Sequence, residues 1–245
     1  TDSDRDQIYD LLQQCLNGTP LAYVLGSVQF LNNTYSIQPG VLIPRPETEE
    51  LVRFAEIILT TLISSNHVPD IYECGLGSGV ISIELAQRFP DLFFSGWDIS
   101  ETAIQTTLDN MTKMNLTNMS VIRGDFFPFN RPLDASGCAV LVSNPPYISE
   151  LDYINLDPVV KKEPKSALVA TDDGYSIIKR LIDLAIEQSM VLLCEIGFQQ
   201  RALLMAQYPE LLKFGVDDSG HDRFVYYFPP NVNCSPALFN KLRLH

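Results

Sequence analysis

The feature that most constrains this chain is a regular alternation, from Asp70 onward, of short apolar segments with longer amphipathic ones. The apolar segments have the length of buried strands, and the amphipathic segments repeat apolar residues every three to four positions, as helices do. Strands separated by helices pair in parallel through right-handed crossovers. The pattern therefore predicts an α/β protein with an open, doubly wound, mostly parallel sheet.

Five strands of this sheet can be placed from the sequence, and a further pair follows them. We expect the five at residues 71–74, 93–97, 121–122, 139–142 and 190–194. The helices between them are expected at 80–88, after Ser100, which can cap a helix, and at 175–188. Two later segments, 214–216 and 224–228, predict an antiparallel C-terminal hairpin added to the sheet.

Upstream of the sheet the sequence predicts two helices joined by a longer link. The apolar residues of 1–18 share one helical face, and Asn17-Gly18 supplies a stop for that helix. Prolines in the link at 39–46 forbid a long helix there. Glu47 then opens a helix that runs to about residue 63.

A hairpin is expected between these two helices, over residues 23–37. Val28 and Phe30 would face Tyr35 and Ile37 across the pair Asn32-Asn33. Asparagine tolerates the positive φ angles that tight hairpin turns need. We therefore interpret residues 19–39 as a hairpin linker.

Composition excludes several classes of protein. Of the 245 residues 46% are hydrophobic and 19% are charged, which is enough for a buried core and excludes intrinsic disorder. The formal net charge of −13 repels nucleic-acid phosphates, so nucleic acid is not the expected partner. The sequence contains no run of eighteen apolar residues and does not open with a signal peptide, so we expect no membrane span.

The cysteines and histidines predict neither disulfides nor a metal site. An odd number of thiols without a Cys-x-x-Cys pair is typical of a reduced, cytoplasmic protein; the five are Cys15, Cys74, Cys138, Cys194 and Cys234. The three histidines are scattered as well, so zinc is not expected. Because the chain starts at Thr1 rather than Met, we also expect that an upstream part has been removed.

Polar residues follow all five predicted strands. In an open α/β sheet, ligands bind at the carboxyl ends of the strands, so these residues converge on one edge. They are Glu73-Cys74-Gly75-Leu76-Gly77-Ser78-Gly79, Asp98, Gly124-Asp125-Phe126-Phe127, Asn144-Pro145-Pro146-Tyr147 and Glu195-Ile196-Gly197. Convergence from five separate places predicts a binding site at this edge.

The glycine turn after the first strand lets a ligand approach the backbone, although a simple tight turn is the alternative. Its Gly-x-Gly-x-Gly spacing differs from the dinucleotide fingerprint, which disfavours a pyrophosphate ligand. Asp98 lies at the offset expected of a carboxylate that binds ribose hydroxyls, or else it is an acid placed at a helix N-terminus.

Three further side chains near the turn are candidates for binding a charged nucleoside. Asp125 could accept from an exocyclic amine while the ring of Phe126 covers a purine; the alternative is an acidic turn with core phenylalanines. Glu73 would stabilise a sulfonium or amino group, since unit charges about 4 Å apart attract by about 4 kcal/mol at an effective dielectric of 20. A solvated strand end or a lysine partner is the alternative for Glu73.

Asn144-Pro145-Pro146-Tyr147 is the most informative tetrapeptide in the sequence. Its prolines fix φ and remove backbone donors, which leaves the Asn144 side-chain oxygen and the Pro145 carbonyl as a rigid pair of acceptors. Such a pair suits a planar NH2 group, and Tyr147 adds an aromatic face for a flat substrate. A Pro-Pro turn with a surface tyrosine is the alternative.

Taken together, these residues resemble the HemK/PrmC family of S-adenosylmethionine-dependent amino-methyltransferases. The resemblance runs from about residue 20 to residue 228. It rests on the glycine turn and on four segments: Leu-Ile-Pro-Arg-Pro-Glu-Thr-Glu at 42–49, Val-Ser-Asn-Pro-Pro-Tyr-Ile at 142–148, Glu-Pro-Lys-Ser-Ala-Leu at 163–168, and Glu-Ile-Gly-Phe-Gln-Gln at 195–200. Members of that family methylate the glutamine of the Gly-Gly-Gln loop of bacterial class I peptide-chain release factors.

The resemblance implies a seven-stranded class I methyltransferase sheet with S-adenosylmethionine, later S-adenosylhomocysteine, over the glycine turn. The implied cofactor-binding residues are Glu73, Gly75, Leu76, Gly77, Ser78, Gly79, Asp98, Asp125, Phe126 and Asn144. The implied catalytic residues are Asn144, Pro145 and Tyr147, and Pro146 joins them in binding the substrate. Glu73, Leu76 and Phe126 stand where many members have Asp, a small residue or Trp.

The resemblance also divides the chain. Residues 1–18 would be the remnant of an N-terminal helical domain, 19–39 the hairpin linker, and 40–245 the methyltransferase domain. The resemblance implies that most of the N-terminal domain lies outside this sequence, so we expect the chemistry, and not the docking of a release factor, to follow from the residues present.

Two other classes of function stay open from the sequence. A nucleic-acid adenine N6-methyltransferase shares Asn-Pro-Pro-Tyr, but it needs a flipped base and a basic track, which the net charge of −13 opposes. A nucleotide-binding protein without catalysis, or an NAD-linked oxidoreductase, is the second; the glycine spacing disfavours NAD.

Overall fold

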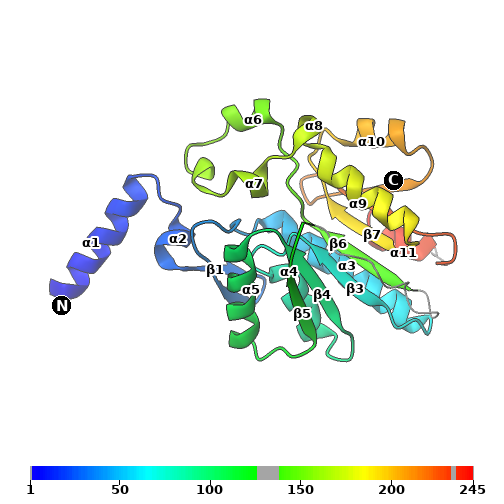
Figure 1. Cartoon of the computed structure of the whole chain (residues 1–245), viewed down its shortest axis with the longest axis horizontal. Coiled ribbons are helices and arrows are strands. Elements are labelled where there is room, and N and C mark those ends of the chain that lie inside the picture. The colour runs from blue at the N-terminus through cyan, green and yellow to red at the C-terminus, as the bar shows by residue number, and fades with distance from the viewer. Residues whose placement is uncertain (1, 126–137, 233–235, 245) are drawn as a thin grey trace.

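A central seven-stranded sheet organises the molecule (Figure 1). The computed structural model describes residues 2–125, 138–232 and 236–244. The strands are β3 (Asp70–Cys74), β4 (Phe94–Asp98), β5 (Met119–Arg123), β6 (Ala139–Ser143), β7 (Val191–Glu195), β8 (Leu212–Val216) and β9 (Asp222–Tyr227). Their order is β5-β4-β3-β6-β7-β9-β8; the first five pair in parallel, and β9 is antiparallel to both β7 and β8. The predicted doubly wound sheet with its C-terminal hairpin is confirmed.

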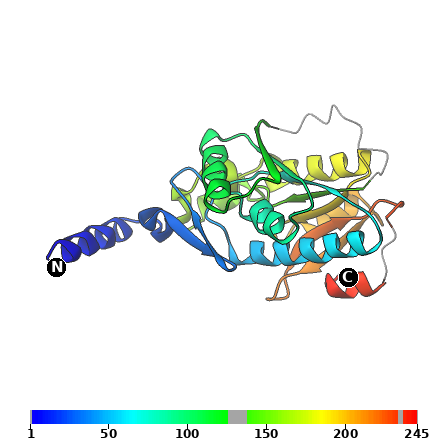
Figure 2. The ribbon, with the colours of Figure 1, turned by 90° about the horizontal axis from the view of Figure 1, so that it is seen from below.

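Two layers of helices cover the sheet, one on each face (Figure 2). They include α3 (Pro46–Ser64), α4 (Val80–Arg88) and α5 (Glu101–Lys113) on one face, and α9 (Ser176–Glu187) and α10 (Arg201–Gln207) on the other. Alternate residues of β6 serve the two faces: Val140 and Val142 belong to the first core, Ala139 and Leu141 to the second. The short α11 (Pro236–Lys241) adds Leu238 to the first core.

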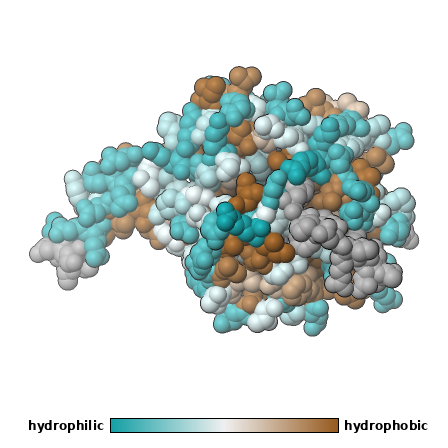
Figure 3. All heavy atoms as spheres, viewed as in Figure 1, coloured by the Kyte–Doolittle hydropathy of each residue, from teal (hydrophilic) through white to brown (hydrophobic). Residues whose placement is uncertain are grey.

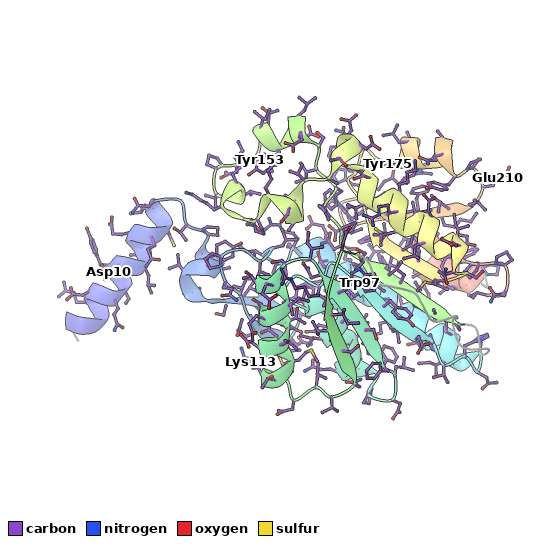
Figure 4. The ribbon with its side chains drawn as sticks, in the orientation of Figure 1. Asp10, Trp97, Lys113, Tyr153, Tyr175 and Glu210 are labelled. Carbon is purple, nitrogen blue, oxygen red and sulfur yellow. The ribbon has the colours of Figure 1, made fainter. Side chains whose placement is uncertain are left out.

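The strand order reverses between β3 and β6, which lie side by side at the middle of the sheet. From β3 the chain proceeds outward through β4 to β5, and from β6 it proceeds the other way to β7. A crevice opens at the carboxyl ends of the strands at such a reversal, and ligands of open α/β sheets bind there. The buried Trp97, at the end of β4, lies near the middle of the molecule (Figure 4).

A string of short helices lies above this edge of the sheet, at the top of Figure 1. It comprises α6 (Glu150–Ile154), the 3-10 helix η1 (Val160–Lys162), α7 (Lys165–Leu168) and α8 (Thr171–Gly174). Leu151 and Ile154 on α6 are exposed, and hydrophobic side chains reach the surface there (Figure 3). Within the part of the chain that the structure describes, no helix combines the length and apolar character needed to cross a membrane.

The N-terminal segments extend away from the sheet (Figures 1 and 2). As predicted, a helix, α1 (Asp2–Leu16), ends before Asn17-Gly18, and its apolar residues are exposed, up to 78% for Leu16. It is followed by α2 (Leu21–Leu25) and by the two-stranded sheet of β1 (Ser27–Phe30) and β2 (Asn33–Ser36).

Part of the hairpin prediction is wrong. Residues 21–25 form the helical turn α2 rather than a strand, and Gly26 ends that turn at φ +67°. Val28 does pair with Tyr35, but Phe30 pairs with Asn33, so the turn is Leu31-Asn32. Leu31 adopts φ +49° because its N–H donates to the Glu49 carboxylate on α3 at 3.0 Å. A tertiary hydrogen bond thus outweighs the local turn preference of Asn32-Asn33.

Candidate functional site

Two cavities meet at the carboxyl edge of the sheet. The first, of about 320 Å³, is lined among others by Gly75, Gly77, Asp98, Ser100 and Asp125, and we call it the glycine-turn cavity. The second, of about 240 Å³, is lined by Arg45, Pro145, Tyr147, Ile148, Val160 and Leu168, and we call it the proline-loop cavity. Both are also lined by Leu42, Asn144, Pro146 and Ala167, so these four residues form the junction.

Asp98 and the glycine turn shape the floor of the glycine-turn cavity. One carboxylate oxygen of Asp98 accepts from the Gly77 N–H at 3.0 Å, and the other accepts from the Ser100 N–H at 2.8 Å. Gly75 and Gly77 have φ of +77° and +56°, and a Cβ on either would meet no protein atom within 4 Å. The space that side chains at these two positions would fill is therefore open. A ligand needs such open space to approach the backbone closely.

Glu73 lies beneath the turn and does not line the cavity. One of its oxygens accepts from the Ser82 N–H of α4 at 2.9 Å, and the other has no hydrogen-bond partner in the structure. Burial raises the pKa of the Glu73 carboxyl to about 8, although the bonds from Ser82 lower it. Glu73 is not among the residues of the cavity wall, and its bond to Ser82 holds the turn against α4.

Leu76 also faces inward, and Gly96 makes room for it. Leu76 is buried, and it is absent from the cavity wall. A Cβ on Gly96 in β4 would collide with the Leu76 side chain. The larger residue at position 76 is thus accommodated inside the sheet by the missing side chain at position 96.

Ser78 and Gly79 complete the turn, which α5 contacts from behind. The Asn110 amide donates to the Ser78 carbonyl at 2.9 Å, and Thr107 donates to the Gly77 carbonyl at 3.1 Å. Gly79 opens α4 at φ +80°, and a Cβ there would lie 2.7 Å from the Thr107 methyl. These residues fix the path of the turn from behind the cavity.

Asp125 lines the outer end of the glycine-turn cavity. It is exposed, and its carboxylate lies 3.6 Å from the Arg180 guanidinium of α9. Phe126, the residue predicted to cover a purine, lies outside the described residues, so the structure does not test that prediction.

Asn144 projects from the end of β6 at the junction of the two cavities. Its amide nitrogen donates to the Thr48 hydroxyl of α3 at 2.8 Å. Thr48 donates in turn to the Glu195 carboxylate at the end of β7, at 3.0 Å. The Tyr147 hydroxyl donates to the other oxygen of Glu195 at 3.1 Å. One buried carboxylate therefore anchors both ends of the Asn-Pro-Pro-Tyr loop.

The electrostatics of this network are set by burial. Glu195 is only 1% exposed, and burial raises the pKa of its carboxyl to about 7. The hydroxyls of Thr48 and Tyr147 and the charge of Arg223 oppose that shift. Burial, with the neighbouring Glu195 carboxylate, raises the pKa of the Tyr147 phenol, so Tyr147 stays a hydrogen-bond donor.

Gln200 supports the same loop from below. Its amide nitrogen donates to the carbonyls of Tyr147 at 3.2 Å and Gly174 at 2.9 Å, and its oxygen accepts from the Gly197 N–H at 2.9 Å. Gly174 has φ +83°, and a Cβ there would collide with the Tyr147 carbonyl oxygen. The backbone of α8 thus passes directly against the loop.

A second buried carboxylate closes the wall of the proline-loop cavity. Glu163 accepts from the Arg45 guanidinium at 2.6 Å and from the Ile43 N–H at 2.9 Å. This clasp joins the segment 42–49 to the segment 163–168, two of the four segments that carry the resemblance. The two segments, 120 residues apart in the sequence, are therefore held together at the cavity.

Sequence reasoning found the strand-end residues and missed their partners. Thr48, Glu163 and Gln200 lie in the segments that carry the resemblance, and Glu195 follows a predicted strand, but no sequence pattern assigns these residues their partners. The sequence gives a weak indication of a structural role for Thr107 and Asn110, because they are polar residues on the buried side of an amphipathic helix. Such a position needs a hydrogen-bond partner in the core.

The sheet order, the glycine turn with Asp98, and a strand-end Asn-Pro-Pro-Tyr together define a class I methyltransferase. A sequence model described as "Putative methyltransferase" matches residues 67–135. Among solved structures, the hMettl16 catalytic domain in complex with MAT2A 3′UTR hairpin 1 superposes with a TM-score of 0.63 over 82% of this chain and 76% of that one, at 14% identity. The N-terminal domain of human METTL16 in complex with SAH gives 0.53 over 79% and 75%, also at 14% identity. Both show the fold.

Curated relatives identify the family. The release factor glutamine methyltransferase of Staphylococcus aureus (strain NCTC 8325 / PS 47) is 34% identical over 231 residues, which cover 89% of this chain and 80% of the relative. That of Neisseria gonorrhoeae (strain ATCC 700825 / FA 1090) is 35% identical over 204 residues, which cover 82% and 72%. The chain belongs to the release factor glutamine methyltransferase family.

Proposed function

We propose that this protein transfers a methyl group from S-adenosylmethionine to the side-chain amide nitrogen of the glutamine in the Gly-Gly-Gln loop of bacterial class I release factors. Membership of the family supports this activity. The observation that carries it is the position of Asn144 at the junction of two cavities, with its amide nitrogen already bonded to Thr48. The Asn144 oxygen is then available to an incoming carboxamide.

The glycine-turn cavity fits the cofactor in size and in chemistry. Its volume of about 320 Å³ lies in the range of small-molecule sites. We assign Asp98 to the ribose hydroxyls, Gly75 and Gly77 to the close approach of the backbone, and Asp125 to the adenine amine. S-adenosylmethionine supplies a methyl group on a positively charged sulfur. Glu73, Leu76, Ser78 and Gly79 serve this binding indirectly, because they build the turn from behind.

The acceptor side has to hold a poor nucleophile. The lone pair of an amide nitrogen is delocalised, so the nitrogen needs help as its positive charge develops. The Asn144 oxygen and the Pro145 carbonyl would accept the two N–H bonds of the glutamine and stabilise that charge with prearranged dipoles. Alignment of the two reactants at the junction can contribute about 7–11 kcal/mol to lowering the barrier.

Pro146 and Tyr147 give this acceptor pair its rigidity. Two consecutive prolines fix the backbone, and the Tyr147 hydroxyl is held by Glu195. The ring of Tyr147 lines the proline-loop cavity, where it would lie along the flat carboxamide. The proton that the product nitrogen loses would pass to water.

The proposed partner is a protein rather than a nucleic acid. The net charge of −13 opposes a phosphate backbone and tolerates a basic protein. The cysteines of the described residues, Cys15, Cys74, Cys138 and Cys194, are free thiols, which supports a place in the reducing cytoplasm, where release factors act.

The direct test is mass spectrometry of a bacterial class I release factor after incubation with the protein and S-adenosylmethionine. We expect one added methyl group, 14 Da, on the peptide that contains the loop glutamine, at about one equivalent. A release factor with that glutamine changed to alanine is the matched control and should stay unmodified. Transfer of labelled methyl to duplex DNA or RNA instead would establish the adenine methyltransferase alternative.

A further inference from the structure

We propose that Thr48 and Glu195 are positioning residues that fix the Asn144 amide with its oxygen toward the junction of the two cavities. The inference rests on the proposed function, because it concerns the atom that would receive the glutamine amide. Neither residue lines either cavity. Thr48 acts through Asn144, and Glu195 acts through Thr48 and Tyr147.

The orientation of an asparagine amide decides whether it can serve this reaction. One end of the amide accepts hydrogen bonds and the other end donates two. The glutamine nitrogen presents N–H bonds, so only the oxygen of Asn144 can bind it. An amide rotated by half a turn would oppose donors to donors and exclude the substrate.

The direction of the hydrogen bonds follows from the carboxylate. An ionised Glu195 carries no proton, so the Thr48 hydroxyl, 3.0 Å away, must donate to it. A hydroxyl has a single hydrogen, so Thr48 can then only accept from Asn144. The bond of 2.8 Å between them therefore requires the nitrogen of Asn144 to face Thr48, which turns the oxygen the other way.

Tyr147 reinforces this polarity at the second oxygen of Glu195, where its hydroxyl donates at 3.1 Å. Both oxygens of the carboxylate thus receive a donor. A protonated Glu195 would carry a hydrogen of its own and could donate to Thr48. Thr48 could then donate to the oxygen of Asn144, and the amide would be held in the unproductive orientation.

The charge state of Glu195 depends on burial and on titratable groups from three neighbouring elements. Tyr147 faces it from the loop after β6, Arg223 from β9, and Glu47 from α3. Burial outweighs the favourable charge of Arg223 and raises the pKa of Glu195 to about 7. A switch in polarity would therefore fall within the range of an ordinary enzyme assay.

The test compares Thr48→Val, which keeps the shape and removes the hydroxyl, with Thr48→Ser, which restores the hydroxyl. We expect kcat for release-factor methylation to fall by about tenfold or more in Thr48→Val and to be largely recovered in Thr48→Ser. The dissociation constant of S-adenosylhomocysteine, measured by calorimetry, should stay within about twofold, because Thr48 lies outside the glycine-turn cavity.

A matched control lies on the same helix. Thr61 is partly buried on α3, and its hydroxyl donates only to the Ile57 carbonyl of its own helix, at 2.8 Å. Thr61→Val makes the same chemical change far from the site and should leave kcat unchanged. Melting curves of the variants establish that each is folded at the assay temperature.

The pH profile separates positioning from a loss of packing. In the wild type, kcat should fall by about tenfold per pH unit below an apparent pKa near that of Glu195, about 7. Thr48→Val and Glu195→Gln should both lose this inflection. A wild type that methylates while Thr48→Val matches its kcat, or an inflection that persists in Glu195→Gln, would overturn the inference. A wild type without methylation of any release factor overturns the proposed function, and the inference with it.

Discussion

The two cavities of the site are built in different ways. The floor of the glycine-turn cavity takes its form from backbone groups and from Asp98, which binds a turn only 21 residues before it. The proline-loop cavity depends on side chains that meet across the fold: Asn144 and Thr48 are 96 residues apart, and Thr48 and Glu195 are 147 apart. The contact between Asp98 and the turn is local structure at two neighbouring strand ends, whereas the network behind the proline loop exists only once α3, β6 and β7 have come together.

The difference predicts a separation of effects. Changes in the glycine-turn cavity should act on cofactor affinity, and changes around the proline loop should act on turnover.

The largest effect should come from Asn144→Ala. The variant removes the acceptor at the junction, and we expect transfer to a release factor to fall by at least about a hundredfold. Binding of S-adenosylmethionine should remain measurable by calorimetry. Asn231→Ala, an exposed asparagine elsewhere on the surface, is the control. Equal rates for Asn144→Ala and wild type would refute the assigned role.

Asp98→Ala tests the glycine-turn cavity, where we expect an effect on cofactor affinity. The loss of charged hydrogen bonds to the ribose should weaken cofactor binding by about tenfold to a hundredfold. At saturating cofactor kcat should change little. Calorimetric titration measures the affinity, and the exposed Asp91→Asn serves as the control. An unchanged affinity in Asp98→Ala would mean that the ribose lies elsewhere.

Gly174→Ala tests how closely α8 supports the proline loop. The substitution forces a side chain into a backbone at φ +83° and against the Tyr147 carbonyl. We expect a loss of about 3 kcal/mol in the free energy of unfolding, of which the backbone conformation alone accounts for about 1. Gly220, at φ +81° with no atom within 4 Å, provides the matched control, and Gly220→Ala should lose only the smaller amount. Urea unfolding measures both; equal losses would show that the contact with Tyr147 is unimportant.

The last prediction concerns Glu73, the buried carboxylate beneath the glycine turn. Its pKa is about 8 in the fold against a usual value of 4.5, so the fold favours the protonated form. Stability from this group is therefore present at low pH and is lost as pH rises from about 5 through 8. Relative to Glu73→Gln, the wild type should lose several kcal/mol over that range, at most about 4, measured by urea unfolding at each pH. A difference that is constant with pH would contradict the assignment.

The sheet and its functional edge were predictable because they depend on short-range pattern. Apolar periodicity located the strands, and topology alone brings Asp98 and Asn144 to one edge. The hairpin turn was misplaced, since no local pattern reveals that Glu49 binds the Leu31 N–H. The sequence also does not show which residues of the turn line the cavity, because no pattern reveals that Leu76 points into the sheet.

The partners of the acceptor loop could not be predicted for the same reason. Thr48, Glu195 and Gln200 act through hydrogen bonds whose other member lies far along the chain. Residue type and spacing mark such side chains as unusual in a core, yet the partner is fixed by three-dimensional packing. The family resemblance includes the segments that contain these residues, but it does not give the hydrogen bonds that they make.

The pairing of Leu76 with Gly96 has a consequence for the history of this family. A side chain at position 96 and a large one at position 76 compete for one volume inside the sheet. A chain with a small residue at 76 would have room for a side chain at 96, whereas leucine at 76 requires glycine at 96 on the neighbouring strand. The two positions should therefore covary in an alignment of homologues. A variant with a side chain added at position 96 while Leu76 is kept should fold poorly.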